Sequence, residues 1–75
     1  MKKFKRITFN PAVMGGKPCI KGTRITVGVI VGLFASGYSQ EEILGLYPDL
    51  QNNDIQEALS YAAWRSEEIE VPLAK

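Results

Sequence analysis

The side chains that most often carry catalysis are scarce in this chain of 75 residues. Its single cysteine, Cys19, and its lack of histidine exclude a Cys–His nucleophile, a Ser–His–Asp triad and a zinc site within one copy. Gly16-Lys17 does not begin a phosphate loop, because the upstream glycine spacing is wrong and Pro18 replaces the required Ser or Thr. A lone thiol without a neighbouring base is commonly a small packing residue. The sequence therefore predicts no enzyme, cofactor or metal site.

Positive charge is concentrated in the first half of the chain. Residues 1–38 contain seven Lys and Arg and no acidic residue, whereas residues 39–75 contain two basic and eight acidic residues. The net charge of +1 hides this separation. The basic half could meet a polyanion and the acidic half a basic protein. The alternative is that the charges only solvate opposite ends of a small domain.

Two groups of side chains are candidates for nucleic-acid binding. Lys and Arg of the basic half would contact phosphates, and amides on a predicted third helix would read base edges. These candidates are Lys3, Lys5, Arg6, Lys17, Lys21, Arg24, Asn52, Asn53 and Gln56. Asp54 and Glu57 on the same helix would repel phosphates, and no sequence signal brings the basic half close to this helix. That mismatch weakens a simple DNA-reading hypothesis.

A small β-hairpin is predicted at the N-terminal side. Residues 18–20 and 23–25 form two short extended runs, and Lys21-Gly22 has the composition of a two-residue turn between them. A strand over residues 5–9 is expected to pack against this hairpin, because an isolated hairpin is marginal in water.

Three helices are predicted after the hairpin. Thr26 is the expected N-cap of a helix over residues 27–35, and Gly37 suits the left-handed position after it. Ser39 and Glu42 match a capping box for a short helix that ends near Leu46. Asn53 is the expected N-cap of a helix that ends near residue 66. The fold class is mainly α, a three-helix, helix-turn-helix-like core with a small N-terminal β-hairpin.

The helix over residues 27–35 has no polar side chain and needs cover on nearly all sides. Its glycines either pack in a core helix or allow another helix to approach closely. The candidate dimer interface is Gly28, Val29, Gly32 and Leu33.

Trp64 projects away from the predicted core face of the third helix, so that it is covered either within its own fold or by a partner. The candidate partner-binding residues are Tyr61, Trp64, Glu68, Ile69, Val71 and Leu73.

The length indicates one domain. Residues 1–66 are expected to form it, and residues 67–75 an acidic C-terminal tail that could be flexible until a partner orders it. No apolar segment before Pro11 suits a signal peptide, and the run over residues 27–35 is too short to cross a bilayer. A cytoplasmic location is expected.

Four segments resemble a known family. They are ITFNPAVMGGKPCIKGTRITV at residues 7–27, SGYSQEEIL at 36–44, YPDL at 47–50 and DIQEALSYAA at 54–63. Together they closely resemble the bacterial domain-of-unknown-function 433 family, with GKPxIxGTRI as the most specific part. Thr26 departs from the proline that is common at its position, which affects only how the first helix begins.

The resemblance implies a homeodomain-like helix-turn-helix domain that acts as an antitoxin. Its expected partners are a nuclease-like toxin of the PIN-like class and, for autoregulation, its own operator DNA bound as a homodimer. The resemblance carries over no catalytic residue. Two alternatives remain, a stand-alone DNA-binding regulator and a dimeric interaction module that binds no nucleic acid.

Overall fold

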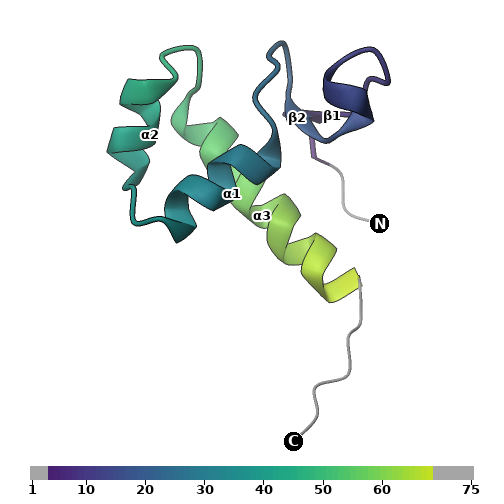
Figure 1. Cartoon of the computed structure of the whole chain (residues 1–75). Coiled ribbons are helices and arrows are strands. Elements are labelled where there is room, and N and C mark those ends of the chain that lie inside the picture. The colour runs from purple at the N-terminus through teal and green to yellow at the C-terminus, as the bar shows by residue number, and fades with distance from the viewer. Residues whose placement is uncertain (1–3, 69–75) are drawn as a thin grey trace, which may run out of the picture.

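The computed structural model describes residues 4–68 of the chain and the side chains of residues 4–66. Three helices follow a small N-terminal sheet, as the fold class predicted (Figure 1). The elements in order are β1 (Ile7–Thr8), the 3₁₀ turn η1 (Met14–Gly16), β2 (Cys19–Ile20), α1 (Val27–Ala35), α2 (Gln40–Leu46) and α3 (Asn52–Glu68).

The sheet contains two antiparallel strands, in which Ile7 of β1 lies opposite Ile20 of β2 and Thr8 lies opposite Cys19. The strand predicted at residues 5–9 therefore pairs with β2 as expected, although it is shorter. The predicted two-residue hairpin between residues 18–20 and 23–25 is wrong. After β2 the chain forms a four-residue loop, Lys21–Arg24, and returns with a single bridge between Cys19 and Thr26.

The two arms pair in a wider register than predicted, because the Ile20 N–H donates to the Ile25 carbonyl and the Val27 N–H to the Pro18 carbonyl, both at 2.9 Å. The Thr23 hydroxyl stabilises the longer loop: it donates to the Ile20 carbonyl at 2.8 Å and accepts from the Ile25 N–H at 3.0 Å. The turn itself is present, because the Thr23 N–H donates to the Ile20 carbonyl and Gly22 has a φ of +77°. In this turn only the second central residue, Gly22, has a positive φ, which is typical of a type II turn. The two-residue hairpin that was predicted requires a turn of type I′ or II′ instead.

The first two helices begin at the predicted caps. The Thr26 hydroxyl accepts from the Val29 N–H at the start of α1, and Gly37 takes a φ of +99° after its end. Ser39 and Glu42 form the reciprocal capping box at the start of α2. The two partners of each cap are only three residues apart in the sequence, so these signals are local and can be predicted from the sequence.

The third helix begins earlier than predicted. Asn53 is not its cap, because α3 already starts at Asn52. The Gln51 carbonyl accepts the first helical N–H groups, and the Asp54 carboxylate accepts the Gln51 N–H at 2.9 Å. Asp54 therefore supplies the returning half of a capping box from the third helical position.

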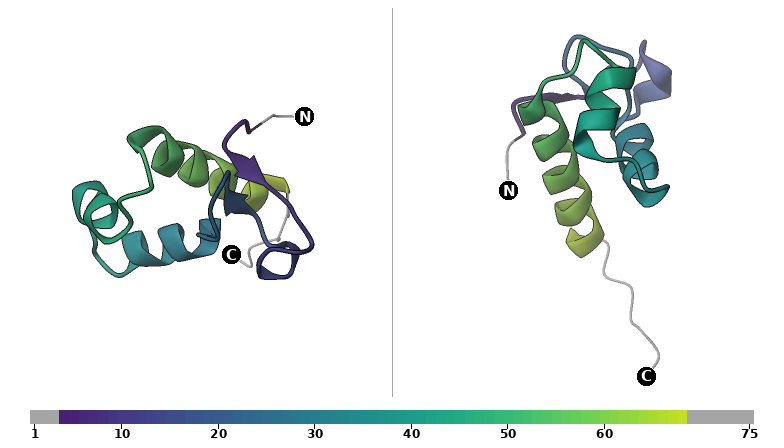
Figure 2. Two further views of the ribbon diagram at one scale, coloured as in Figure 1. Left: turned by 90° about the horizontal axis from the view of Figure 1, so that it is seen from above. Right: turned by 90° about the vertical axis from the view of Figure 1, so that its left-hand side faces the viewer.

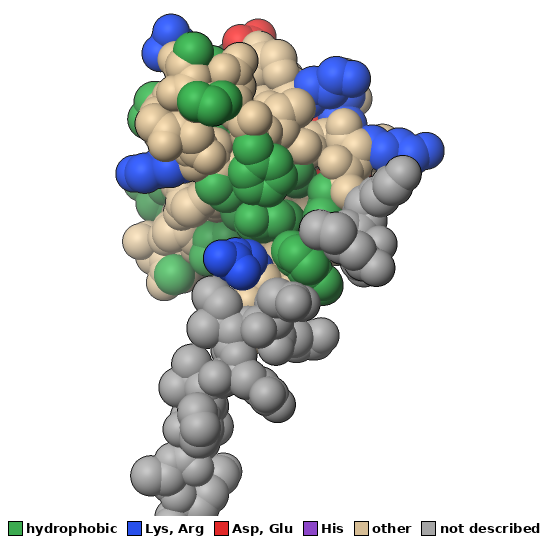
Figure 3. Space-filling model, turned by 90° about the vertical axis from the view of Figure 1, so that its right-hand side faces the viewer, with side chains coloured by type: hydrophobic (Ala, Val, Ile, Leu, Met, Phe, Trp, Pro, Cys, Tyr) green, Lys and Arg blue, Asp and Glu red, His purple; other side chains and the backbone are tan. Residues whose placement is uncertain are grey.

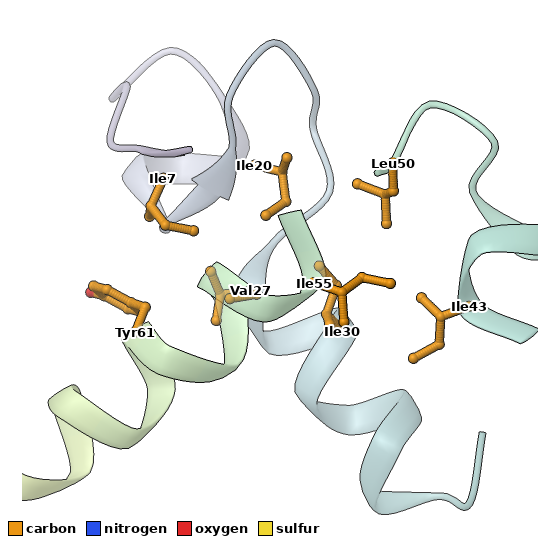
Figure 4. Close-up of a cluster of buried hydrophobic side chains, with 9 residues drawn as sticks. Ile7, Ile20, Val27, Ile30, Ile43, Leu50, Ile55 and Tyr61 are labelled. Carbon is orange, nitrogen blue, oxygen red and sulfur yellow. The ribbon is translucent and has the colours of Figure 1, made fainter. Parts of the chain in front are cut away.

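The core lies where α3 crosses α1, with α2 packed beside them (Figures 1 and 2). Isoleucines from β2 and all three helices are fully buried there, and β1 and the α2–α3 connection add further side chains (Figure 4). The buried cluster consists of Ile7, Ile20, Val27, Ile30, Ile43, Leu50, Ile55, Ala58 and Tyr61. Between residues 4 and 68, no helix has the length and apolar character needed to cross a membrane.

Candidate nucleic-acid interface

The segment before β1 is attached to α3 by an ion pair. The Arg6 Nε lies 2.5 Å from the Asp54 Oδ1, and Asp54 is completely buried. The backbone N–H of Arg6 also donates to the Glu57 carboxylate. We call residues 4–6 the N-terminal arm. These contacts hold the arm against the first half of α3, about 50 positions further along the chain.

The ion pair determines the charge state of Asp54. Burial by itself would raise the pKa of Asp54, but the hydrogen bond from Arg6, the backbone hydrogen bond from Gln51 and the charge of Arg6 together hold that pKa below its ordinary value of 3.8. The hydrogen bond and charge of Asp54 in turn raise the pKa of Arg6 above its ordinary value. Asp54 is therefore a carboxylate at neutral pH, and its negative charge is compensated inside the fold.

The arm and α3 enclose an open groove with a volume of about 460 Å³. From α3 the groove is lined by Asn53, Gln56 and Ser60, which are exposed and spaced along one face of the helix. Exposed Lys5 and partly exposed Arg6 line the other side. We call this surface the α3 groove. Its polar groups are the amides and hydroxyl of α3, the cations Lys5 and Arg6, and the carboxylate of Glu57.

The structure reduces the mismatch between the basic half and the acidic third helix. Asp54 is buried and forms an ion pair with Arg6, so its charge is compensated inside the fold. Glu57 is half-buried and accepts the Arg6 N–H, but it still lines the α3 groove as an acid beside Lys5. The sequence could identify Asn53 and Gln56 as base-reading candidates, but not their position next to Lys5.

The other nucleic-acid candidates are not gathered at this groove. Exposed Lys17 lies beside the first turn of α1, in a hollow that it shares with Gly28 and Val29. Lys21 and Arg24 belong to the loop after β2. The Asn52 side chain accepts a hydrogen bond from Gln40, and Lys3 lies outside the described residues.

The partner-binding candidates on α3 form part of an aromatic cluster. Tyr61 is only 8% exposed, so its assignment to a partner surface is wrong: the ring belongs to the core. Trp64 is half-buried, with ring centroids of Phe4 and Tyr61 each 5.8 Å away. Phe4 of the arm therefore covers part of Trp64 within its own fold, one of the two alternatives that the sequence left open. The side chain of Glu68 and the residues Ile69, Val71 and Leu73 lie outside the described part of the chain.

Phe9 is a surface residue that the sequence analysis did not single out. It is 59% exposed although its ring centroid lies 5.9 Å from that of Tyr61. On the side of the molecule that carries the sheet and the second half of α3, hydrophobic side chains gather between Lys and Arg side chains (Figure 3). Because β1 ends at Thr8, Phe9 lies outside the paired strands.

The predicted dimer residues lie on the outer side of α1. Gly28, Val29 and Gly32 are exposed, and Leu33 is half-buried. A helix without a polar side chain therefore presents part of its surface to solvent in the single chain. Over residues 4–68, no group of three carboxylate or thiol side chains lies close enough together to hold a metal ion.

Comparison with known proteins identifies the same family over most of the chain. Residues 7–62 match the family model described as "Protein of unknown function (DUF433)". An uncharacterized protein of Sinorhizobium fredii, y4eO, is 36% identical over 56 residues, which are 75% of this chain and 25% of that protein. The crystal structure of a DUF433 member from Anabaena variabilis superposes with a TM-score of 0.79 at 34% identity, covering 85% of this chain and 63% of that one. The chain thus spans about a quarter of the length of the curated relative and less than two thirds of the crystallised one.

Proposed function

The chain belongs to the DUF433 family, and on that premise we propose that it is an operator-binding antitoxin that holds duplex DNA in the α3 groove. The proposal is of a binding protein and not of an enzyme. Its two parts, DNA binding and toxin binding, rest on different observations and are tested separately.

The observation that supports DNA binding is the position of the N-terminal arm beside the amide-bearing face of α3. Asn and Gln side chains can form paired hydrogen bonds to adenine in the major groove, and Lys neutralises phosphates. Homeodomains use the same division, in which the third helix reads the major groove and an N-terminal arm enters the adjacent minor groove. Asn53 and Gln56 correspond to the first role and Lys5 to the second.

The DNA-binding test uses fluorescence anisotropy with the duplex upstream of the chain's own gene and a shuffled duplex of equal length. Gln56→Ala should weaken binding to the operator by about 1–3 kcal/mol and hardly affect the shuffled duplex. Lys5→Gln should weaken binding to both and lower the salt-dependence slope by about 1. Lys17→Gln is the matched control, since it removes the same charge on the side of α1. Absence of binding at low salt, or equal effects of the two Lys variants, would contradict the proposal.

Toxin binding is supported by the family resemblance and by the acidic composition of the chain's end. Glu67, Glu68 and Glu70 lie close together, followed by or interleaved with Ile69 and Val71, and such a segment is complementary to the basic RNA site expected of a nuclease toxin. A tagged full-length chain should co-purify from its native host with a stoichiometric nuclease-like protein. Removal of residues 69–75 leaves α3 complete and should abolish that co-purification without changing the melting temperature. A clean preparation without a partner would favour a stand-alone DNA-binding regulator.

The dimeric module is the second candidate, and the exposed face of α1 favours it. The homodimer expected for an operator-binding protein would use the same face. A side chain added at Gly32 meets nothing within 4 Å in the single chain, so Gly32→Lys should disrupt only an assembly. Gly45→Lys on α2 is the control, because its surroundings are equally open. Sedimentation should show a dimer for the wild type and Gly45→Lys and a monomer for Gly32→Lys; a monomeric wild type would rule the dimer out.

A further inference from the structure

A second hollow, with a volume of about 340 Å³, lies between β1, the segment after it and the loop that follows β2. It is separate from the α3 groove and shares no lining residue with it. Its lining includes the most specific part of the family-like sequence. The residues that matter for its chemistry are Thr8, Asn10, Cys19, Gly22, Thr23 and Arg24.

The lining residues carry hydrogen-bond donors that are not used by the fold. In the part of the chain that the structure describes, the backbone N–H groups of Gly22 and Arg24 have no acceptor, and the Arg24 guanidinium has no ion-pair or hydrogen-bond partner. The Asn10 side-chain oxygen accepts the Ala12 N–H at 2.9 Å, which leaves the amide NH₂ as a donor. Backbone N–H groups of a turn together with a guanidinium form a donor set suited to an anion.

The loop that carries these donors is held in shape without a ligand. The Thr23 hydroxyl donates one hydrogen bond to the Ile20 carbonyl, before Arg24 in the chain, and accepts another from the Ile25 N–H, after it. Gly22 adopts a φ of +77°, which an L-residue with a side chain disfavours. A site formed in advance loses little entropy when a ligand binds.

The charge of the hollow requires an acidic ligand. None of the lining residues is acidic, and the first 38 residues of the chain contain no Asp or Glu at all. Cys19, which also lines the hollow, is 2% exposed. From this donor set we propose that the loop Lys21–Arg24 and Asn10 bind a phosphate group. A phosphate carries the several acceptor oxygens that donors from four different groups can satisfy together.

Two sources can supply the phosphate, the backbone of duplex DNA or a small phosphorylated compound. The loop after β2 and the segment that leads into α3 project from the same end of the molecule (Figure 1). DNA in the α3 groove could therefore pass close to the hollow. Only the DNA source rests on the proposed function; binding of a free phosphate stands without it.

The test is a titration of the ¹⁵N-labelled full chain with sodium phosphate, followed by NMR, against sodium chloride at equal ionic strength. Phosphate should cause saturable shifts of the Gly22, Thr23, Arg24 and Asn10 amide signals. Arg24→Gln should abolish them without disturbing the signals of the core, since Arg24 is exposed and its side chain forms no hydrogen bond or ion pair within residues 4–68. Lys17→Gln, with the same loss of charge, should leave them unchanged. Equal shifts in chloride, or a titration that Arg24→Gln does not alter, would overturn the proposal.

The same variants distinguish the two sources. If Arg24→Gln also lowers affinity for duplex DNA and reduces the salt-dependence slope by about 1, the site binds a backbone phosphate. If duplex affinity is unchanged while the phosphate shifts disappear, the site serves a small phosphorylated compound. Failure of the chain to bind any DNA would remove the proposed function but would leave the phosphate titration as an independent result.

Discussion

Replacing Asp54 by Ala should destabilise the protein far more than replacing any acid on its surface. Asp54 is fully buried and accepts two hydrogen bonds, from the Arg6 side chain at 2.5 Å and from the Gln51 N–H at 2.9 Å. It therefore joins the start of α3 to the N-terminal arm. Asp54→Ala removes both bonds at once.

The expected loss in free energy of unfolding is about 2–4 kcal/mol. An N-terminal capping bond contributes about 1 kcal/mol, and a hydrogen bond to a charged group about 1.5–3 kcal/mol. The loss stays below the largest values known for broken buried pairs, because the Arg6 side chain is 36% exposed and can be rehydrated when its partner is removed. A domain of 75 residues has a total stability of about 4–11 kcal/mol, so this one carboxylate accounts for a large part of it.

Urea and thermal unfolding at neutral pH, monitored by circular dichroism, measure this loss. At about 4–8 °C per kcal/mol for a domain of this size, the melting temperature should fall by about 8–32 °C. Asp49→Ala is the control, because Asp49 is exposed, and its effect should stay within about 0.5 kcal/mol. A loss for Asp54→Ala below about 1 kcal/mol, or equal to that of the control, would refute the assigned role of the ion pair.

Further predictions concern pH, the core and the helix ends. Because the folded-state pKa of Asp54 is held below 3.8, the stability that its charge contributes is complete above that pH and is lost as the pH falls through the lower folded-state pKa. The free energy of unfolding in urea should therefore change less between about pH 5 and about pH 3 for Asp54→Asn than for the wild type. Equal changes would count against the ion pair. Ile55→Ala should cost about 2–5 kcal/mol in the same unfolding assay, since Ile55 is completely buried, and a cost near zero would mean that the core is packed differently. Ser39→Ala should cost about 1 kcal/mol by removing the capping box of α2, unless that helix frays already in the wild type. Gly37→Ala should lower the free energy of unfolding by about 1–2 kcal/mol because Gly37 has a φ of +99°. Gly45→Ala inside α2 should raise it by up to about 1 kcal/mol, since nothing lies near the added side chain. Effects of the same sign would contradict this backbone argument.

Most of the secondary structure could be predicted from the sequence, because its signals act over one turn of chain. Thr26, Ser39 with Glu42, and Gly37 each meet their partners within a few residues, and α1 and α2 begin where these caps predicted. The two errors arose where a side chain was used in a way that composition does not reveal. Thr23 closes the loop after β2 with its hydroxyl, and Asp54 takes over the capping role that was assigned to Asn53.

The candidate nucleic-acid interface is only half visible in the sequence. Asn53 and Gln56 are recognisable because they are amides on a predicted helix, and Lys5 because it lies in a basic segment. Their position on two sides of one groove depends on the ion pair between Arg6 and Asp54, whose members are 48 positions apart.

The sequence by itself thus determined the three helices, the caps of the first two, the separation of charge and the absence of a histidine-based catalytic site. Only the tertiary structure decided that Asp54 and Glu57 contact the arm, that Tyr61 belongs to the core, and that the residues of the loop after β2 line a hollow without acidic groups. The physical reason is that caps and turns depend on contacts between near neighbours. A charged surface depends instead on which distant side chains neutralise each other once the chain has folded.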